Sequence, residues 1–94
     1  MTPAQCRAAR AMVDLSQEDL AKAAAVSLST VRNFEAGRTL PIANNLAAMR
    51  RVLEGAGIIF LDEGAETVGG PGVRLKARRN DFVPPGELTS ETDS

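Results

Sequence analysis

The chain has 94 residues, a formal net charge of −1, one Cys and no His, and this length suits one small domain. Without His there is no His general base, no Ser–His or Cys–His nucleophile pair and no His-ligated metal, so we expect neither an enzyme nor a metal or other cofactor. A single Cys excludes an internal disulfide and favours a reducing cytoplasm.

The N-terminal stretch predicts a helix that extends to about Val13. Thr2 suits the N-cap, Pro3 the first helical position and Gln5 the third. The stretch is polar and lacks the apolar segment of a secretory signal peptide, so we expect no such peptide.

Two short helices follow, separated by barely a turn. Ser16 is the expected N-cap of the first, with Glu18 and Asp19 in its first turn, where the helix dipole favours acids. Ser27 is the expected N-cap of the second, and Gly37 lies just past its end. The pattern predicts two helices that meet at a tight corner.

A fourth helix and a hairpin complete the predicted elements. The helix begins near Asn44 or Asn45 and ends at the next glycines. Residues 57–62 are β-branched and apolar, and residues 73–76 alternate apolar and basic side chains, so both are predicted strands, joined by a Gly-rich turn. No apolar run is long enough to span a bilayer, and we expect no membrane partner.

Charge is unevenly distributed along the chain. Residues 1–54 carry seven basic and five acidic side chains, residues 55–80 four and three, and residues 81–94 none and four. The body is therefore mildly basic, which permits DNA binding. Pro, Gly, Thr, Ser and acidic residues dominate the C-terminal stretch, so residues 78–94 are predicted to form a disordered acidic tail.

The spacing of the second and third helices predicts a helix-turn-helix. Two short helices joined by a turn of three to four residues pack at a steep angle, which Leu20, Val26 and Phe34 can fix from inside. Side chains one or four positions apart in residues 28–33 form one outward flank of the third helix. A helix held in this way can enter a DNA major groove, which is about 12 Å wide.

These features lie in LSQEDLAKAAAVSLSTVRNFEAGRT, residues 15–39, and residues 5–54 resemble the Cro/C1-type helix-turn-helix family, also called the XRE family. The resemblance implies a four-helix, lambda-repressor-like helix-turn-helix domain in residues 1–56. With the β-hairpin that the residues themselves predict in 57–77, the expected fold is mainly α. It also implies a bacterial or phage origin and sequence-specific binding to double-stranded DNA. The turn position that is commonly Gly in the family is Ala25 here, which costs on the order of 1 kcal/mol if its backbone is left-handed.

The resemblance also implies a set of DNA-contacting side chains. In the third helix, Arg32 favours guanine, Asn33 favours adenine and Leu28 suits a thymine methyl group, whereas phosphate contacts position the protein. The full set comprises Gln17, Ser27, Leu28, Ser29, Thr30, Arg32, Asn33, Arg38 and Thr39. The family commonly pairs the positions of Arg10 and Glu35, which we expect to form a structural ion pair and not a DNA contact.

The predicted hairpin stands where simple repressor domains of this family have a fifth helix. The first strand is apolar on both faces, and a four-helix core of this size can cover only one of them. A two-fold homodimer with an intermolecular sheet would cover the other face and place two recognition helices about 34 Å apart. The expected dimerisation residues are Ile58, Ile59, Phe60, Leu61, Val73 and Leu75. The alternative is a monomer in which the hairpin folds back on the fourth helix.

The sequence favours a DNA-binding transcriptional regulator, specifically a cytoplasmic repressor that binds double-stranded DNA as a homodimer. The alternative is a protein-binding regulator, such as an antiactivator or antitoxin, that captures a transcription factor or toxin with the helix-turn-helix surface. The mild basicity and the apolar Leu28 at the start of the third helix favour this alternative. An enzyme is a distant third, because the chain has no His, one Cys and no Gly-rich phosphate-binding loop. The GGPG segment, residues 69–72, is interpreted as part of the hairpin turn.

Overall fold

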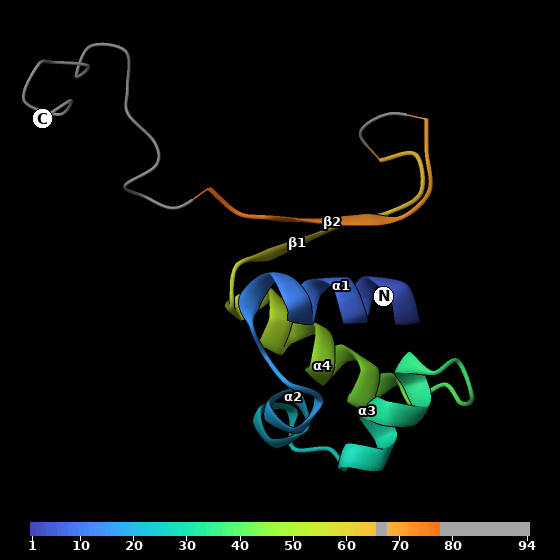
Figure 1. Cartoon of the computed structure of the whole chain (residues 1–94). Coiled ribbons are helices and arrows are strands. Elements are labelled where there is room, and N and C mark those ends of the chain that lie inside the picture. Colours follow the sequence, from blue (N-terminus) through green and yellow to red (C-terminus); the bar gives the residue numbers. More distant parts are fainter. Residues whose placement is uncertain (66–67, 78–94) are drawn as a thin grey trace, which may run out of the picture.

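Four helices come first in the chain and one antiparallel hairpin follows them (Figure 1). The computed structural model describes residues 1–65 and 68–77, so the predicted disordered tail, residues 78–94, lies outside the described residues. The helices are α1 (Pro3–Val13), α2 (Gln17–Ala24), α3 (Leu28–Glu35) and α4 (Ala43–Gly55), and the strands are β1 (Ile58–Leu61) and β2 (Gly72–Leu75). This arrangement confirms the predicted fold class. Within the described residues, no helix has the length and apolar character needed to cross a bilayer.

Side-chain caps start the first three helices where the sequence predicts them. Thr2 Oγ1 accepts a hydrogen bond from the N–H of Gln5, and Gln5 Oε1 accepts from the N–H of Thr2, which makes a capping box. Ser16 and Asp19 form the same reciprocal pair at α2. Ser27 caps α3 through the N–H of the third helical residue. Each cap satisfies an N–H group that has no partner inside the helix.

The corner between α2 and α3 depends on one left-handed residue. Ala25 has φ 59° and ψ 42°, and its N–H donates to the carbonyls of Ala21 and Lys22. The N–H of Val26 donates to Ala21 O at 3.0 Å. These bonds satisfy the last carbonyls of α2 and turn the chain into α3. Ala25 therefore has the backbone for which Gly is the easier residue.

The core lies where the four helices meet beneath the hairpin (Figure 1). Its largest fully buried side chains are Phe34, Leu20, Met49, Leu53, Val31 and Cys6. Ala9, Ala21 and Ala24 are also buried, and their small side chains let the helices approach closely. Ile58 connects the hairpin to the same cluster. Cys6 is buried in this core as a small, free thiol.

The start of α4 differs slightly from the prediction. The sequence predicts a start near Asn44 or Asn45, because Asn is a common N-cap residue. The helix instead begins at Ala43, and its N-cap is Ile42, which makes no side-chain cap hydrogen bond. The carbonyl of Ile42 accepts from the N–H groups of Asn45 and Leu46, both at 3.0 Å. Backbone geometry alone starts this helix, so cap residues in the sequence do not mark its first turn.

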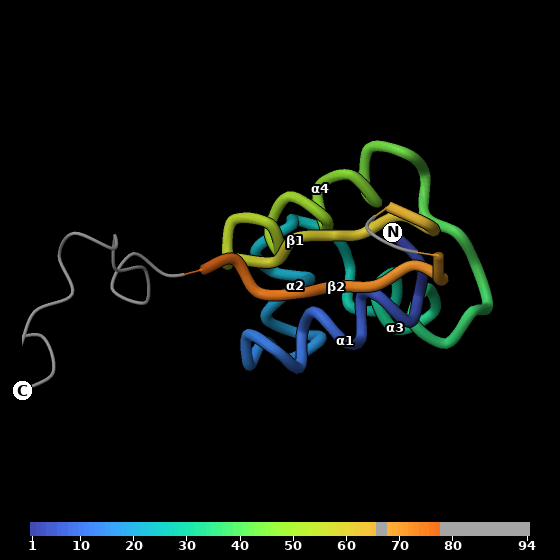
Figure 2. The backbone as a smooth tube through the Cα atoms, turned by 90° about the horizontal axis from the view of Figure 1, so that it is seen from above, coloured from blue at the N-terminus to red at the C-terminus, as the bar shows by residue number. Residues whose placement is uncertain are grey.

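The hairpin lies across α1 and α4 (Figure 2). In its antiparallel register Ile58 is opposite Leu75 and Phe60 is opposite Val73. Successive residues of a strand alternate between faces, so these two pairs share the face toward the helices. Phe60 and Val73 accordingly pack against the core. Both strands lie within one residue of their predicted boundaries.

Candidate nucleic-acid interface

One flank of α3 is exposed and the other is buried. Val31 and Phe34 are buried in the core, whereas Ser29 and Arg32 are exposed. Because the four residues belong to one rigid helix, the buried pair fixes the direction in which the exposed pair points. The structure therefore places Ser29 and Arg32, two of the predicted base-contacting residues, on the surface.

Three hydroxyl groups cluster at the N-terminus of α3. Ser27 Oγ accepts from the N–H of Thr30 at 3.1 Å, and it lies 2.7 Å from Thr30 Oγ1 and 3.1 Å from Ser29 Oγ. Hydroxyl groups donate to phosphate oxygens, and a helix N-terminus adds a partial positive charge. The cluster brings together three of the predicted DNA-contacting residues.

The turn after α3 brings Arg38 and Thr39 back beside Asn33. Their backbone N–H groups donate to Asn33 O at 2.8 and 3.4 Å, and Arg38 Nη1 lies 3.5 Å from Asn33 Oδ1. Gly37, with φ 76°, permits this turn. Arg38 and Thr39 are exposed and Asn33 is half-buried. A guanidinium and an amide of the predicted set thus lie together at the end of α3.

Two predicted contact residues of α3 are less accessible than its exposed flank. Leu28 is half-buried and packs against the core. Thr30 is also half-buried and is engaged with Ser27. Part of the Leu28 side chain therefore stabilises the position of α3, and only the remainder faces solvent.

Glu35 joins the last turn of α3 to α1 and α2. Its carboxylate accepts from Arg10 Nε and Nη2, both at 2.7 Å, from Gln17 Nε2 at 2.9 Å and from Cys6 Sγ at 3.1 Å. Arg7 Nη1 donates to the backbone carbonyl of Glu35. The expected ion pair between Arg10 and Glu35 is confirmed. The cluster ties the middle and last turn of α1 and the start of α2 to the helix that carries the exposed flank.

The contacts of Glu35 set the protonation states in this cluster. Burial raises the pKa of Glu35, but hydrogen bonds from Arg10, Cys6 and Gln17 outweigh burial, and the net pKa lies below the ordinary Glu value. The hydrogen bond to Glu35 raises the pKa of Arg10. Burial, with a further contribution from Glu35, raises the pKa of the Cys6 thiol. The cluster therefore contains an ionised carboxylate, a charged guanidinium and a neutral thiol.

Gln17 faces both this cluster and the surface. It occupies the first helical position of α2 and is half-buried. The bond from its Nε2 to Glu35 uses one of two N–H groups. The second N–H is the group with which Gln17, a member of the predicted DNA-contacting set, would donate to a phosphate oxygen, because Oε1 can only accept.

Sequence reasoning identified only Arg10 among the donors to Glu35. Cys6 lies four residues before Arg10 on α1, and residues at this spacing share a helix face, so a partner of Arg10 also lies near Cys6. That spacing was a usable signal for Cys6. For Gln17 there was none, because no other residue of α2 was expected to contact Glu35.

The residues predicted to form a dimer contact divide between the two faces of the hairpin. Those that pack within the subunit are Ile58, Phe60 and Val73. Ile59 and Leu61 alternate with them and lie on the opposite face, where both are half-buried. Leu75 lies at the end of β2 and is 50% exposed. Ile59 and Leu61 are therefore the members of the set that face outward, whereas Leu75 lies on the side toward α1 and is reachable only because it is at the end of the strand.

The part of the chain that carries this surface is similar to a known protein family. A family model described as helix-turn-helix matches residues 7–55, just over half of the chain. The matched range begins within α1 and ends with the last residue of α4, so it contains the corner between α2 and α3 and the exposed flank of α3. No curated protein matches the chain.

Proposed function

The chain belongs to the Cro/C1-type helix-turn-helix family of DNA-binding regulators, and on this premise we propose that it is a cytoplasmic repressor that binds an inverted-repeat operator as a homodimer. The exposed flank of α3 carries the proposal, because Ser29 and Arg32 face solvent while Val31 and Phe34 hold the helix from inside. A firmly held helix with polar side chains on its outer flank has the shape and chemistry that major-groove recognition requires.

The proposed base contacts come from α3, and the phosphate contacts come from its surroundings. Arg32 donates to O6 and N7 of guanine, Asn33 pairs with adenine and Leu28 meets a thymine methyl group. Ser29 hydrogen-bonds a base edge. The proposed phosphate-binding residues are Gln17, Ser27, Thr30, Arg38 and Thr39. Phosphate contacts make the affinity depend on salt, and base contacts make it depend on sequence.

The homodimer is proposed to form through the hairpin. Ile59 and Leu61 lie on its outer face and Leu75 is 50% exposed, and a second copy would remove these apolar groups from water. Two-fold symmetry would place the two α3 helices on half-sites about 34 Å apart. We propose that the dimer represses transcription when it occupies such a site within a promoter.

Selection of binding sites from random duplexes, run beside light scattering for mass, tests the proposal. We expect an inverted-repeat site, a mass of two chains and an affinity that falls steeply between about 50 and about 200 mM salt. Arg32→Ala and Asn33→Ala should each reduce the preference for the selected site by about 1–3 kcal/mol. Arg51→Ala removes an exposed charge from α4 and should leave that preference unchanged. A protein that binds no duplex at low salt would refute the proposal.

Exposed apolar side chains near α3 favour a second candidate, a protein-binding regulator of the antiactivator or antitoxin type. Leu40 is 75% and Ile42 is 68% exposed, and both lie in the segment between α3 and α4. Neighbouring apolar groups at this exposure are typical of partner contacts. If no duplex is bound, and Leu28→Asp or Leu40→Asp breaks a complex with a transcription factor or toxin, the second candidate is correct.

A further inference from the structure

The hairpin is covalently attached to the helical domain at one end only. The chain enters β1 through Gly57, whose φ of 110° is rarely adopted by other residues, and Lys76 N donates to Gly57 O at 2.7 Å. At the other end of the ladder, beside the hairpin loop, Leu61 is opposite Gly72. This distal end is covalently linked to no helix, so side chains must hold it in place.

Gln5 of α1 provides the distal attachment. Its Nε2 donates to Leu61 O at 3.1 Å and to Gly72 O at 2.9 Å, so it binds one backbone carbonyl of each strand. Its Oε1 accepts from Thr2 N at 2.8 Å. The carboxamide thus uses both N–H groups and its oxygen, and the side chain joins the N-cap of α1 to the last pair of the ladder. Gln5 is only 6% exposed, so water does not compete freely for these bonds.

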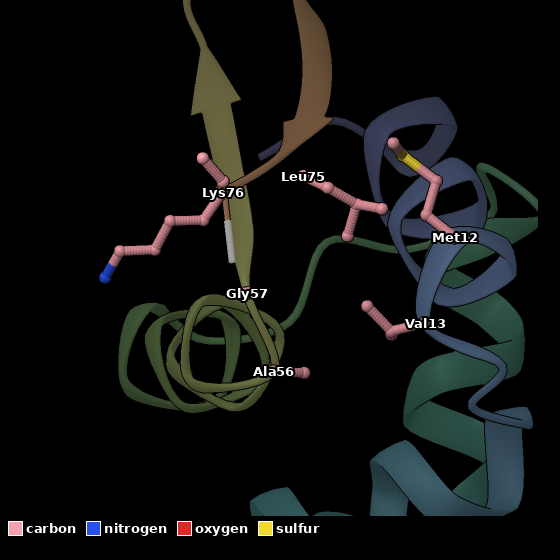
Figure 3. A pocket seen from close by; sticks show the side chains of 7 residues that line it. Met12, Val13, Ala56, Gly57, Leu75 and Lys76 are labelled. Atoms are coloured by element: carbon pink, nitrogen blue, oxygen red, sulfur yellow. The ribbon is translucent and has the colours of Figure 1, made fainter. Parts of the chain in front are cut away.

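Surface hollows lie between α1 and β2 at both ends of the strand. A hollow of about 260 Å³ is lined by Gln5, and beside it α1 contributes the small side chains of Ala4 and Ala8. A second hollow, of about 580 Å³, lies near the covalent end, where Met12 and Leu75 line it and Lys76 points away from Met12 (Figure 3). Phe60 and Val73 pack against the core one pair further in, and the hydrogen bonds of Gln5 attach the last pair of the ladder, Leu61 and Gly72, to α1.

We propose that Gln5 is a positioning residue that fixes the hairpin against α1 and thereby sets the separation of the two recognition helices in the dimer. This inference rests on the proposed homodimer through the hairpin. In that dimer, a pivot of the hairpin about Gly57 moves one copy of α3 relative to the other. The preferred spacing of the two half-sites in the operator therefore depends on Gln5, which itself contacts no DNA in the proposal.

Two substitutions separate the hairpin attachment from the helix cap. Gln5→Glu replaces the two N–H donors with a carboxylate that faces two carbonyl oxygens, while the length of the side chain is kept. Thr2→Ala is the control, because it removes the hydroxyl that caps α1 but leaves the N–H that donates to Gln5. If Gln5→Glu does not fold, Gln5→Met replaces it, since Met has a similar length and no donor.

Hydrogen exchange of the protein without DNA tests the attachment. In Gln5→Glu we expect exchange in β1 and β2 to be at least about tenfold faster than in wild type, and exchange in α2 and α3 to stay within about twofold. Thr2→Ala should leave β1 and β2 within about twofold of wild type. Equal exchange of the strands in Gln5→Glu and wild type would overturn the inference.

Titration against operators with half-sites at stepped separations tests the positioning role. Wild type and Thr2→Ala should bind most tightly to operators with one half-site separation. In Gln5→Glu the ratio of affinities for that separation and for the others should fall about tenfold, while the affinity for a single half-site stays within about twofold of wild type. An unchanged spacing preference overturns the role, even if the strands exchange faster. If the wild-type protein is monomeric or binds no duplex, the proposed function is refuted and the positioning role with it. The exchange experiment does not depend on that result, and it still decides whether Gln5 holds the hairpin against α1.

Discussion

Arg10 and Glu35 meet in a bidentate ion pair, in which Nε and Nη2 of the guanidinium each lie 2.7 Å from a different carboxylate oxygen. The side chain of Arg10 is 18% exposed and that of Glu35 is 2% exposed, so little water reaches the pair. Two parallel hydrogen bonds fix the relative orientation of both planar groups. The pair therefore joins α1 to the end of α3 in one geometry, and the direction of the exposed flank depends on it.

Arg10→Met should lower the free energy of unfolding by about 3 kcal/mol, because it leaves a buried carboxylate without its cation. The double substitution Arg10→Met/Glu35→Leu should cost less than the sum of the two single substitutions, since it removes the charge together with its partner. Urea unfolding followed by circular dichroism measures each value. As a control, Glu54→Gln breaks the exposed pair with Arg50 and should cost no more than about 0.5 kcal/mol. Equal costs for Arg10→Met and Glu54→Gln would contradict the structural role of the buried pair.

The free energy of unfolding should decrease at acid pH because Glu35 becomes protonated. Its pKa is lower in the folded chain than in the unfolded chain, so ionised Glu35 stabilises the fold above the ordinary Glu pKa of about 4.3. That contribution is lost as the pH falls through the lowered folded value. Urea midpoints measured from about pH 6 to about pH 2 should therefore decline below about pH 4. Glu35→Gln should flatten this decline, and an equally steep decline in that variant would assign it to other carboxylates.

The Cys6 thiol should resist alkylation in the folded protein. The residue is fully buried and its pKa is raised by burial, whereas the thiolate is the form that reacts. Iodoacetamide at about pH 8 should label native protein at least about a hundredfold more slowly than protein in concentrated urea, because labelling requires opening of the core. Mass spectrometry of quenched samples follows the reaction. Native labelling as fast as that of a small thiol would show that Cys6 is accessible.

Ala25→Gly should stabilise the protein by about 0.5–1 kcal/mol. The φ of 59° strains an Ala backbone, and Gly relieves this strain although it gains entropy in the unfolded chain. Thermal unfolding of the variant and wild type measures the difference. Ala47→Gly is the matched control, since Ala47 is exposed within the regular helix α4 and the same change there should destabilise by about 0.5–1 kcal/mol. A loss of stability in Ala25→Gly would mean that strain at the corner is negligible.

Local signals predicted the elements of this fold well. The caps Thr2, Ser16 and Ser27 were all confirmed, because each acts on a backbone N–H only three residues away. The start of α4 was misplaced because Ile42 begins the helix with its backbone carbonyl, which carries no side-chain signal. The attachment of Gln5 to the hairpin spans 56 and 67 residues, and no local pattern contains such a contact.

The candidate interface was predictable to the extent that helix periodicity determines which side chains share a face. Ser29 and Arg32 follow from that periodicity once Val31 and Phe34 are assigned to the core. The engagement of Gln17 with Glu35 could not be predicted, because it depends on how two helices pack. Base contacts and the dimer remain predictions, since they depend on a second molecule.

Arg32→Ala and Arg38→Ala should weaken DNA binding in different ways. Arg32 lies on the exposed flank of α3, so its loss should cost about 1–3 kcal/mol on the selected operator, and much less on a scrambled duplex. Arg38 lies in the turn beyond α3, so its loss should weaken binding to both duplexes about equally and reduce the slope of log affinity against log salt by about one. Fluorescence anisotropy titrations of both duplexes over a series of salt concentrations measure these quantities. Arg51→Ala serves as the charge-matched control on α4. Losses of the same size on operator and scrambled duplex in Arg32→Ala would remove this residue from base recognition and assign it to the phosphate backbone.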